Sequence, residues 1–160
     1  PMGKNWKYVS NDINKSTGEL VRMLVETVSK GGNLMLGVGP SPEGKIEGEV
    51  RSRLDGIGRW LKVNGDAIYE TNPLAPYAEE NIFYTEKRRV RYAIVFADTK
   101  TFAGLRLKTI RPESGDEIHM LGVGRLSWRE DKGGALVSLP ENIRWEHAFV
   151  LAIHRGSPSS

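Results

Sequence analysis

The organisation of this chain is clearest around a short apolar run, Asn33-Leu34-Met35-Leu36-Gly37-Val38. The run is too short for a helix, and an apolar run without alternation is typical of a strand buried on both faces, as in a parallel sheet. We therefore predict a buried strand over residues 33–38. Such a strand needs hydrogen-bonded neighbours on both sides, because burial removes water from its backbone N–H and C=O groups.

Helical periodicity flanks this run on both sides. Ser16 and Glu19 have the spacing of a capping box, in which each side chain bonds the other residue's free backbone N–H. One helical face then carries Leu20, Val21, Leu24, Val25 and Val28. Gly31-Gly32 supplies the left-handed residue that commonly closes a helix. A second helical face carries Ile46, Val50, Leu54, Ile57 and Leu61. The sequence predicts helices over residues 16–30 and 46–64.

Helix, buried strand, loop and helix form an α/β unit that is incomplete on its own. Residues 1–64 are therefore expected to need strands from elsewhere, with a small mixed fold that closes on itself as the alternative. The incomplete unit predicts an exposed apolar surface on residues 20–61 unless a partner covers it. We expect that surface to associate with a separate N-terminal chain or with another copy of this chain.

The second half of the chain, residues 80–154, alternates with the period of strands. Tyr92, Ile94 and Phe96 alternate with other apolar residues, which predicts a central strand covered on both faces. Leu105 and Leu107 alternate with charged residues, which predicts a strand with one wet face. Short strands of this kind, separated by Gly-, Asp-, Pro- and Lys-rich turns, predict an antiparallel β-sandwich or barrel.

The change of period predicts two structural units. We place the boundary near residues 70–80, so that residues 1–70 form the helical unit and residues 71–156 the β unit. Residues 157–160 are predicted to be a flexible tail. Asp131-Lys132-Gly133-Gly134 has the composition of a hairpin turn inside the β unit.

Charge and composition exclude several classes of protein. The net charge is only +3, which is too small for a typical nucleic-acid surface. The densest basic run, Lys87-Arg88-Arg89-Val90-Arg91, is interpreted as a solvated hairpin turn that leads into an edge strand. A nucleic-acid binder is kept as an alternative hypothesis that predicts steep salt dependence. The chain has no cysteine and no apolar run near the roughly 20 residues that span a bilayer, so neither thiol chemistry nor a membrane is predicted.

The residues themselves show no catalytic constellation. Gly37-Val38-Gly39 resembles the start of a dinucleotide loop, but the third glycine position holds Pro42, so a tight structural turn is favoured over a phosphate site. The acidic residues Asp12, Glu43 and Glu47 could face a cleft, although helix starts favour acids anyway. The histidines are interpreted as surface or packing residues: His119, His147 and His154. No metal site and no cofactor is predicted.

Two aromatic residues near the N-terminus lie outside any helical or strand period. Trp6 and Tyr8 belong to a polar segment that precedes the first helix. They are interpreted either as packing anchors or as a surface on which the C–H face of a sugar stacks.

Several segments resemble family twenty-nine α-L-fucosidases. Met2-Gly3-Lys4-Asn5-Trp6-Lys7-Tyr8 resembles their Met-Gly-x-x-Trp-x-Tyr segment, and Val28 to Pro40 is similar to their "VSKGGNLLLNVGP" signature. The resemblance continues through Ile57 to Tyr69 and through His119-Met120-Leu121-Gly122, and it covers essentially the whole chain.

The resemblance implies a fold and an activity. Members have a (β/α)8-like catalytic barrel followed by a β-sandwich, so residues 1–70 would be the C-terminal segment of the barrel and residues 71–156 the C-terminal β-sandwich. They hydrolyse α-L-fucosides with retention, which requires two carboxyl groups about 5–5.5 Å apart. In the family both carboxylates precede the segment that matches Trp6. The isolated chain is therefore expected to be inactive, with a non-catalytic carbohydrate-binding or interaction module as the alternative.

The resemblance also implies site residues and partners. The family's aromatic residue near the C6 methyl group of fucose is carried to Trp6, and Tyr8 is carried as a substrate-binding residue behind it. The implied partner is a fucosylated glycan, bound through the full-length enzyme, and the family suggests an exported or lysosomal protein. Two departures are Gly37, where the family commonly has asparagine, and Lys7, where it has a small residue.

Overall fold

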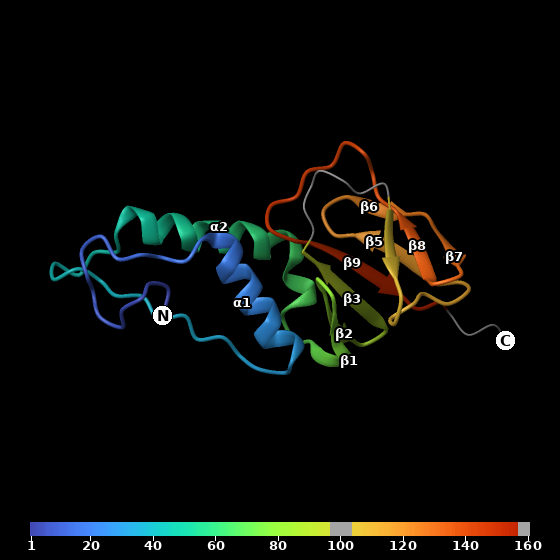
Figure 1. Cartoon of the computed structure of the whole chain (residues 1–160), viewed down its shortest axis with the longest axis horizontal. Helices are drawn as coiled ribbons and strands as arrows, with labels where there is room; N and C mark the ends of the chain where they lie inside the picture. The colour runs from blue at the N-terminus through green and yellow to red at the C-terminus, as the bar shows by residue number, and fades with distance from the viewer. Residues whose placement is uncertain (97–103, 157–160) are drawn as a thin grey trace.

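The computed structural model describes residues 1–96 and 104–156. The tail predicted over residues 157–160 lies outside these ranges. Three helical elements come first: α1 (Thr17–Ser29), α2 (Gly48–Asn64) and the short 3-10 helix η1 (Gly65–Ala67). The helices lie at one end of an elongated molecule and the sheets at the other (Figure 1). Within the described ranges, no helix is long and apolar enough to cross a membrane.

Helix α1 begins and ends as its sequence predicts. The Ser16 hydroxyl accepts a hydrogen bond from the Glu19 backbone N–H at 3.2 Å, and the Ser16 backbone N–H donates to the Glu19 carboxylate at 2.7 Å. The capping box is therefore complete. At the other end Gly31 has φ +83°, a left-handed conformation that closes the helix.

The capping box is expected to contribute measurably to the stability of the chain. Ser16→Ala removes the side-chain acceptor of an orphan helix N–H, so the free energy of unfolding should fall by about 1 kcal/mol. Urea unfolding followed by circular dichroism measures the loss. Ser52→Ala, on the exposed face of α2, is the matched control, and an equal loss in both variants would contradict a capping role for Ser16.

The strand predicted over residues 33–38 is not formed within the described part of the chain. One backbone-to-backbone hydrogen bond reaches it, from the Met2 N–H to the Gly37 carbonyl at 2.9 Å. Its side chains nevertheless alternate, with Met35 94% exposed and its neighbours half-buried. Two of these half-buried residues, Leu36 and Val38, pack on a small cluster formed by Met2, Leu20 and Val50. The segment is not a strand because the described residues give its backbone no neighbouring strand to pair with.

The rest of the chain forms two antiparallel sheets. The larger sheet has the strand order β1-β2-β3-β9-β5-β6 and the smaller one the order β4-β8-β7. The strand bounds are β1 (Asn72–Glu79), β2 (Ile82–Lys87), β3 (Val90–Val95), β4 (Gly104–Leu107), β5 (Glu117–Met120), β6 (Gly124–Leu126), β7 (Trp128–Asp131), β8 (Gly134–Ser138) and β9 (Phe149–His154). The hairpin turn predicted at residues 131–134 joins β7 to β8.

The two sheets enclose the main hydrophobic core, which confirms the predicted β-sandwich. Strands β2, β3, β5 and β9 of the larger sheet face β4 and β8 of the smaller one across this core. Its fully buried members include Tyr84, Leu107, Ile118, Val137, Leu151 and Ile153. Leu105 and Leu107 are buried while Arg106 between them is exposed, as the alternation predicts.

The helices cover the outer face of the larger sheet. Val21, Val25 and Trp60 pack on a second buried cluster whose sheet members include Phe83, Ile94, Val150 and Ala152. The molecule is thus a layer of helices, a six-stranded sheet and a three-stranded sheet (Figure 1). Strand β3 is covered on both faces, as the pattern of Tyr92 and Ile94 predicts.

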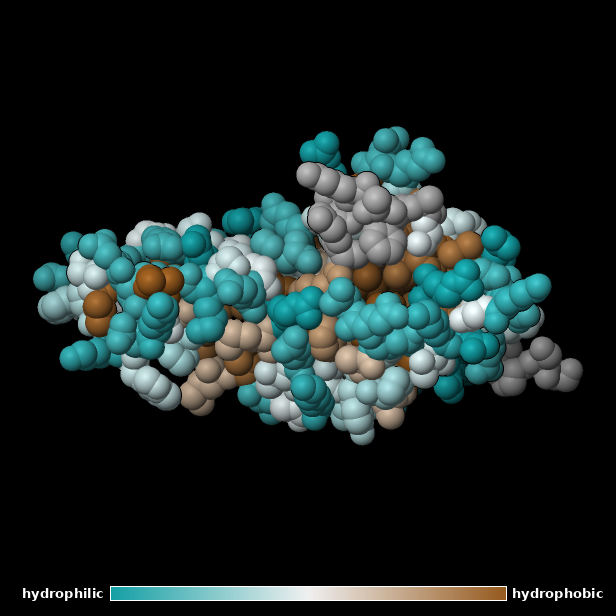
Figure 2. Space-filling model, viewed as in Figure 1, coloured by the Kyte–Doolittle hydropathy of each residue, from teal (hydrophilic) through white to brown (hydrophobic). Residues whose placement is uncertain are grey.

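This arrangement corrects the exposed surface that the sequence predicts on residues 20–61. The apolar face of α1 is buried because the outer face of the larger sheet covers Val21 and Val25. Leu20 is buried against Met2 and Val50 instead. Exposed large apolar side chains in this range are Met35 at 94% and Leu54 at 38%. Figure 2 accordingly shows small, separate apolar spots at the helical end among hydrophilic side chains.

The basic run at residues 87–91 is partly corrected. It does contain the turn between β2 and β3, where Arg88 has φ +56°. The strand that follows is not an edge strand, because β3 pairs with β2 on one side and with β9 on the other. Arg91 is therefore buried, and its guanidinium pairs with the carboxylate of Asp116 at 2.9 Å.

Candidate functional site

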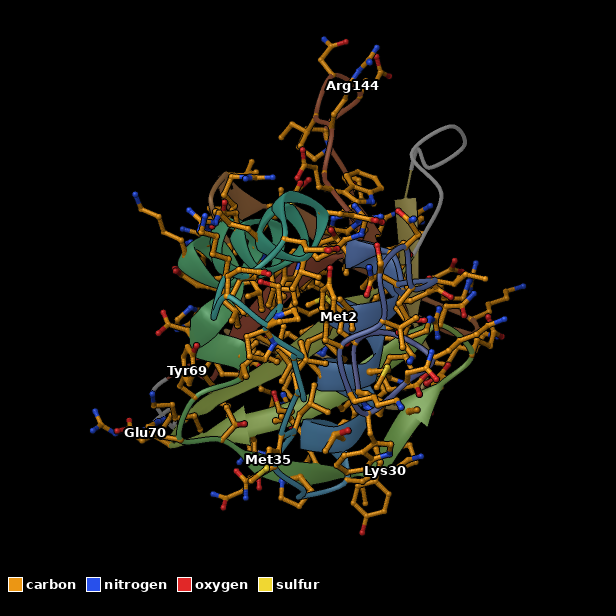
Figure 3. All side chains as sticks on the ribbon, turned by 90° about the vertical axis from the view of Figure 1, so that its left-hand side faces the viewer. Met2, Lys30, Met35, Tyr69, Glu70 and Arg144 are labelled. Carbon is orange, nitrogen blue, oxygen red and sulfur yellow. The ribbon has the colours of Figure 1, made fainter. Side chains whose placement is uncertain are left out.

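The N-terminal segment lies against the run that follows α1. The Met2 N–H bonds the Gly37 carbonyl, and the backbone of Tyr8 passes close to Gly39. A Cβ atom on Gly39 would lie 2.9 Å from the Tyr8 backbone nitrogen, closer than real Cβ contacts. Glycine at this position is therefore required for the close approach of two backbones. Figure 3 shows Met2 near the middle of this end of the molecule and Met35 near its rim.

Tyr8 is held by a residue far away in the sequence. Its hydroxyl donates to the Glu47 carboxylate at 2.6 Å, and Glu47 is the N-cap residue of α2. The hydrogen bond to this carboxylate, together with desolvation, raises the pKa of Tyr8. The bond joins the N-terminal segment to the start of α2, so Tyr8 acts here as an anchor.

Asp12 organises the turn that carries Trp6. Its carboxylate accepts from the Asn5 backbone N–H at 3.1 Å, the Asn5 side-chain amide at 3.0 Å and the Ile13 N–H at 2.9 Å. The backbone N–H of Asn5 is the main cause that lowers the pKa of Asp12. The carboxylate is thus kept charged, and it fixes the backbone on both sides of Trp6.

The two predicted site residues, Trp6 and Tyr8, lie in different environments. Trp6 is 88% exposed, so its ring faces solvent. Tyr8 lines a small polar hollow together with Asn5, Lys7, Gly37 and Glu47. An exposed indole beside polar side chains is able to stack on a C–H face while neighbours bind hydroxyl groups.

The other acidic residues singled out in the sequence, Glu43 and Glu47, accept hydrogen bonds from different partners. Glu47 is brought to Tyr8, whereas Glu43 accepts a hydrogen bond from the Ser41 hydroxyl at 2.8 Å. The Ser41 bond is the main cause that lowers the pKa of Glu43. Across residues 1–96 and 104–156, no group of three or more His, Cys, Asp or Glu side chains is arranged to hold a metal ion.

The sequence patterns did not predict two contacts made by residues that they singled out, one made by Tyr8 and one made by His119. The Tyr8–Glu47 bond joins residues 39 positions apart, and no local pattern signals such a pair. The rings of His119 and His154 meet edge to face at 5.2 Å, because β5 and β9 are neighbours in the larger sheet. That pairing depends on strand order, which the sequence pattern leaves open.

Comparison with known proteins relates both the helical unit and the sandwich to one family. The family model described as alpha-L-fucosidase matches residues 1–66. Tissue alpha-L-fucosidase of Mus musculus is 38% identical over 146 residues, which are 86% of this chain and 32% of that protein. Plasma alpha-L-fucosidase of Homo sapiens is 40% identical over 131 residues, which are 77% of this chain and 28% of that protein. The chain spans about a third of the length of these curated relatives.

Solved structures show the same relationship in three dimensions. Thermotoga maritima alpha-fucosidase in complex with fucose superposes with a TM-score of 0.84 and 29% identity, over 94% of this chain and 37% of that chain. Alpha-L-fucosidase isoenzyme 1 from Paenibacillus thiaminolyticus gives a TM-score of 0.83 with 26% identity, over 96% of this chain and 38% of that chain. Helices and sandwich therefore occur together, in this arrangement, in α-L-fucosidases. The chain belongs to the α-L-fucosidase family.

Proposed function

We propose that this chain is the C-terminal portion of a retaining α-L-fucosidase, in which the catalytic carboxylates are supplied by residues outside these 160. The observation that carries the proposal is the match to α-L-fucosidases across the helical unit and the sandwich together, over about a third of each relative. Residues 1–70 then complete a catalytic barrel and residues 71–156 form the sandwich attached to it.

Residues 33–38 support this placement. Among the described residues, their backbone makes one backbone-to-backbone hydrogen bond, from the Met2 N–H to the Gly37 carbonyl, and Met35 projects almost fully into solvent. Apolar side chains with an unpaired backbone are what a barrel strand leaves behind when its neighbours are not in the same chain segment. We therefore propose that a catalytic N-terminal part, or a second copy, covers Met35 and the backbone of residues 33–38.

Trp6 is proposed as the residue that contacts the substrate. Its indole is exposed on a turn fixed by Asp12, while Tyr8 is tied to Glu47 and is therefore assigned to positioning. In this proposal the indole packs on the apolar C6 methyl group of a terminal fucose. A fucosylated glycan is the substrate class, and hydrolysis involves no cofactor.

The proposal predicts different activities for this chain and for a longer protein that also carries the N-terminal catalytic part. The purified 160-residue chain should not hydrolyse an aryl α-L-fucoside, whereas the longer protein should. In that protein Trp6→Ala should lower kcat/KM by about 10- to 100-fold, the range for losing one apolar contact to a substrate. Steady-state kinetics with 4-nitrophenyl α-L-fucoside measure both effects.

The matched control is Trp128→Ala, which removes a tryptophan of the sandwich and should leave kcat/KM unchanged. Turnover by the 160-residue chain would contradict the assignment of the carboxylates to residues outside it. A longer protein without hydrolysis would instead favour the alternative, a non-catalytic carbohydrate-binding or interaction module. Equal losses in the Trp6 and Trp128 variants would remove Trp6 from the substrate site.

A further inference from the structure

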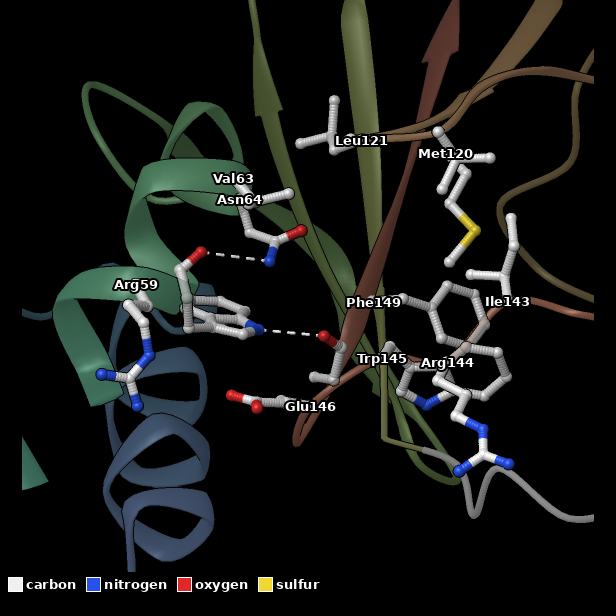
Figure 4. Close-up of a pocket in the computed structure, with 14 residues that line it drawn as sticks. Arg59, Val63, Asn64, Met120, Leu121, Ile143, Arg144, Trp145, Glu146 and Phe149 are labelled. Carbon is white, nitrogen blue, oxygen red and sulfur yellow. Dashed lines mark hydrogen bonds between the residues drawn. The ribbon is translucent and has the colours of Figure 1, made fainter. Parts of the chain in front are cut away.

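A second concave site lies at the C-terminal end of α2, whereas Tyr8 is bonded to Glu47 at the N-terminal end of the same helix. It is a groove of about 380 Å³ between the C-terminal half of α2, the turn after β5 and the segment that leads into β9. Figure 4 shows Asn64 on one wall and Ile143, Trp145 and Phe149 on the opposite wall. No residue that lines this groove also lines the hollow beside Tyr8.

The walls of the groove are held by contacts within the chain. The Trp60 indole N–H donates to the Ala148 carbonyl at 2.9 Å and is buried (dashed in Figure 4). The Leu121 N–H donates to the Val150 carbonyl at 3.0 Å. Gly122 has φ +77°, and a Cβ atom on it would lie 2.7 Å from Val63. Glycine there lets the turn press against α2, so the groove is formed before any ligand arrives.

The lining combines apolar surface with a polar side chain that is largely buried. The rings of Trp145 and Phe149 lie 4.5 Å apart and form an aromatic wall. Asn64 is only 6% exposed, and its amide nitrogen donates to the Trp60 carbonyl at 3.1 Å. That bond turns the amide oxygen toward the space between the walls (Figure 4). The charged residues Arg59 and Glu146 line the groove as well.

We propose that this groove binds one monosaccharide ring and is a sugar-binding site separate from the catalytic one. The C–H face of the ring would lie on Trp145, and a ring hydroxyl would donate to the Asn64 amide oxygen. The volume falls near the lower end of ligand pockets, which span about 300–1,000 Å³, so a single ring fits better than a chain of sugars.

The polar residues favour a sugar over a purely apolar ligand. An apolar ligand would cover the Asn64 oxygen without offering it a donor, and a buried acceptor without a partner is costly. A sugar offers hydroxyl groups to that oxygen, and the groove is also lined by the charged residues Arg59 and Glu146. The site goes beyond the proposed hydrolysis, because its residues come from α2 and the sandwich rather than from the turn that carries Trp6.

The tryptophan side chains give a direct test on the 160-residue chain. The sequence has four tryptophans, so the chain gives four indole N–H signals by nitrogen-15 NMR. Titration with L-fucose and with D-galactose should shift the signals of Trp60 and Trp145 and leave those of Trp6 and Trp128 in place. The expected dissociation constant is about 1 mM, which is ordinary for a ligand with so few atoms. Glycerol, which has hydroxyls but no ring, should produce no shift.

Two variants separate binding from folding. Trp145→Ala removes the proposed stacking surface, and Val123→Phe fills the groove from an exposed position that is 44% accessible. Both should abolish the shift of Trp60, while Trp6→Ala should not. Absence of any shift with either sugar, or an equal shift with glycerol, would overturn the proposal. A shift confined to Trp6 would also overturn it, and would place sugar binding at the turn proposed for hydrolysis instead.

Discussion

Trp60→Ala is expected to lower the free energy of unfolding by about 3–5 kcal/mol, the usual cost of deleting a large buried aromatic side chain. Trp60 is 5% exposed and packs in the cluster that joins the helices to the larger sheet. The substitution also leaves the Ala148 carbonyl without the indole N–H that it accepts at 2.9 Å. The cavity and the lost hydrogen bond both weaken the packing of α2 on the larger sheet, so α2 should loosen from it.

Urea unfolding followed by circular dichroism measures this loss. Trp60→Phe keeps most of the volume and removes only the N–H donor, so it should cost about 1–3 kcal/mol, the penalty of an unsatisfied buried acceptor. Trp6→Ala is the matched control, because Trp6 is 88% exposed. Its effect should stay within about 0.5 kcal/mol. Similar losses for Trp60→Ala and Trp6→Ala would show that Trp60 does not join the helices to the sheet.

Asp116→Ala is expected to cost about 3 kcal/mol, because removing one partner of a buried ion pair leaves the other charge uncompensated. The side chains of Arg91 and Asp116 are 10% and 5% exposed. The Asp116 carboxylate also accepts the backbone N–H groups of Glu113 and Gly156, each at 3.0 Å. A single carboxylate therefore joins β3 to the turn before β5 and to the end of β9.

The ion pair also predicts how stability depends on pH. Burial raises the pKa of Asp116, but the N–H groups of Glu113 and Gly156 and the charge of Arg91 outweigh burial and hold the pKa below its ordinary value. A carboxyl group with a lowered folded-state pKa contributes stability at a pH above its unfolded value, about 3.9. That contribution is lost as the pH falls below this value toward the folded-state pKa. Stability should therefore fall less steeply in Asp116→Ala than in the parent chain over that range.

Two comparisons isolate the buried pair. Asp131→Asn breaks the more exposed pair between Arg106 and Asp131, and it should cost no more than about 1 kcal/mol. Arg91→Met combined with Asp116→Ala should cost less than the sum of the single substitutions, because no unpaired charge remains. Additive losses, or an unchanged pH dependence in Asp116→Ala, would contradict the role of Asp116 as a buried anion.

Short-range signals in the sequence predicted much of this fold. The capping box at Ser16, the left-handed glycine at Gly31 and the hairpin turn at residues 131–134 are all present. Alternation at Leu105 and Leu107 predicted the face that is buried. These features depend on residues a few positions apart, so the chain specifies them before any distant contact forms.

Where the sequence failed, the missing information was a distant neighbour. The apolar run at residues 33–38 predicted a strand, but a strand exists only with a hydrogen-bonded partner, and the described residues supply none. The basic run at residues 87–91 suggested an edge strand, yet β9, more than 50 residues later in the sequence, pairs with β3 and buries Arg91. The burial of α1 against the sheet was missed for the same reason.

Residue types and spacings thus specified the helices, the turns, the faces of the strands and the resemblance to α-L-fucosidases, because each of these depends on local backbone preference or on the order of residues along the chain. Strand order, the Tyr8–Glu47 bond, the Arg91–Asp116 pair and the groove beside Trp60 arise only when the helices pack on the larger sheet. They are contacts between segments far apart in the chain, and packing in three dimensions, not local sequence, brings such segments together.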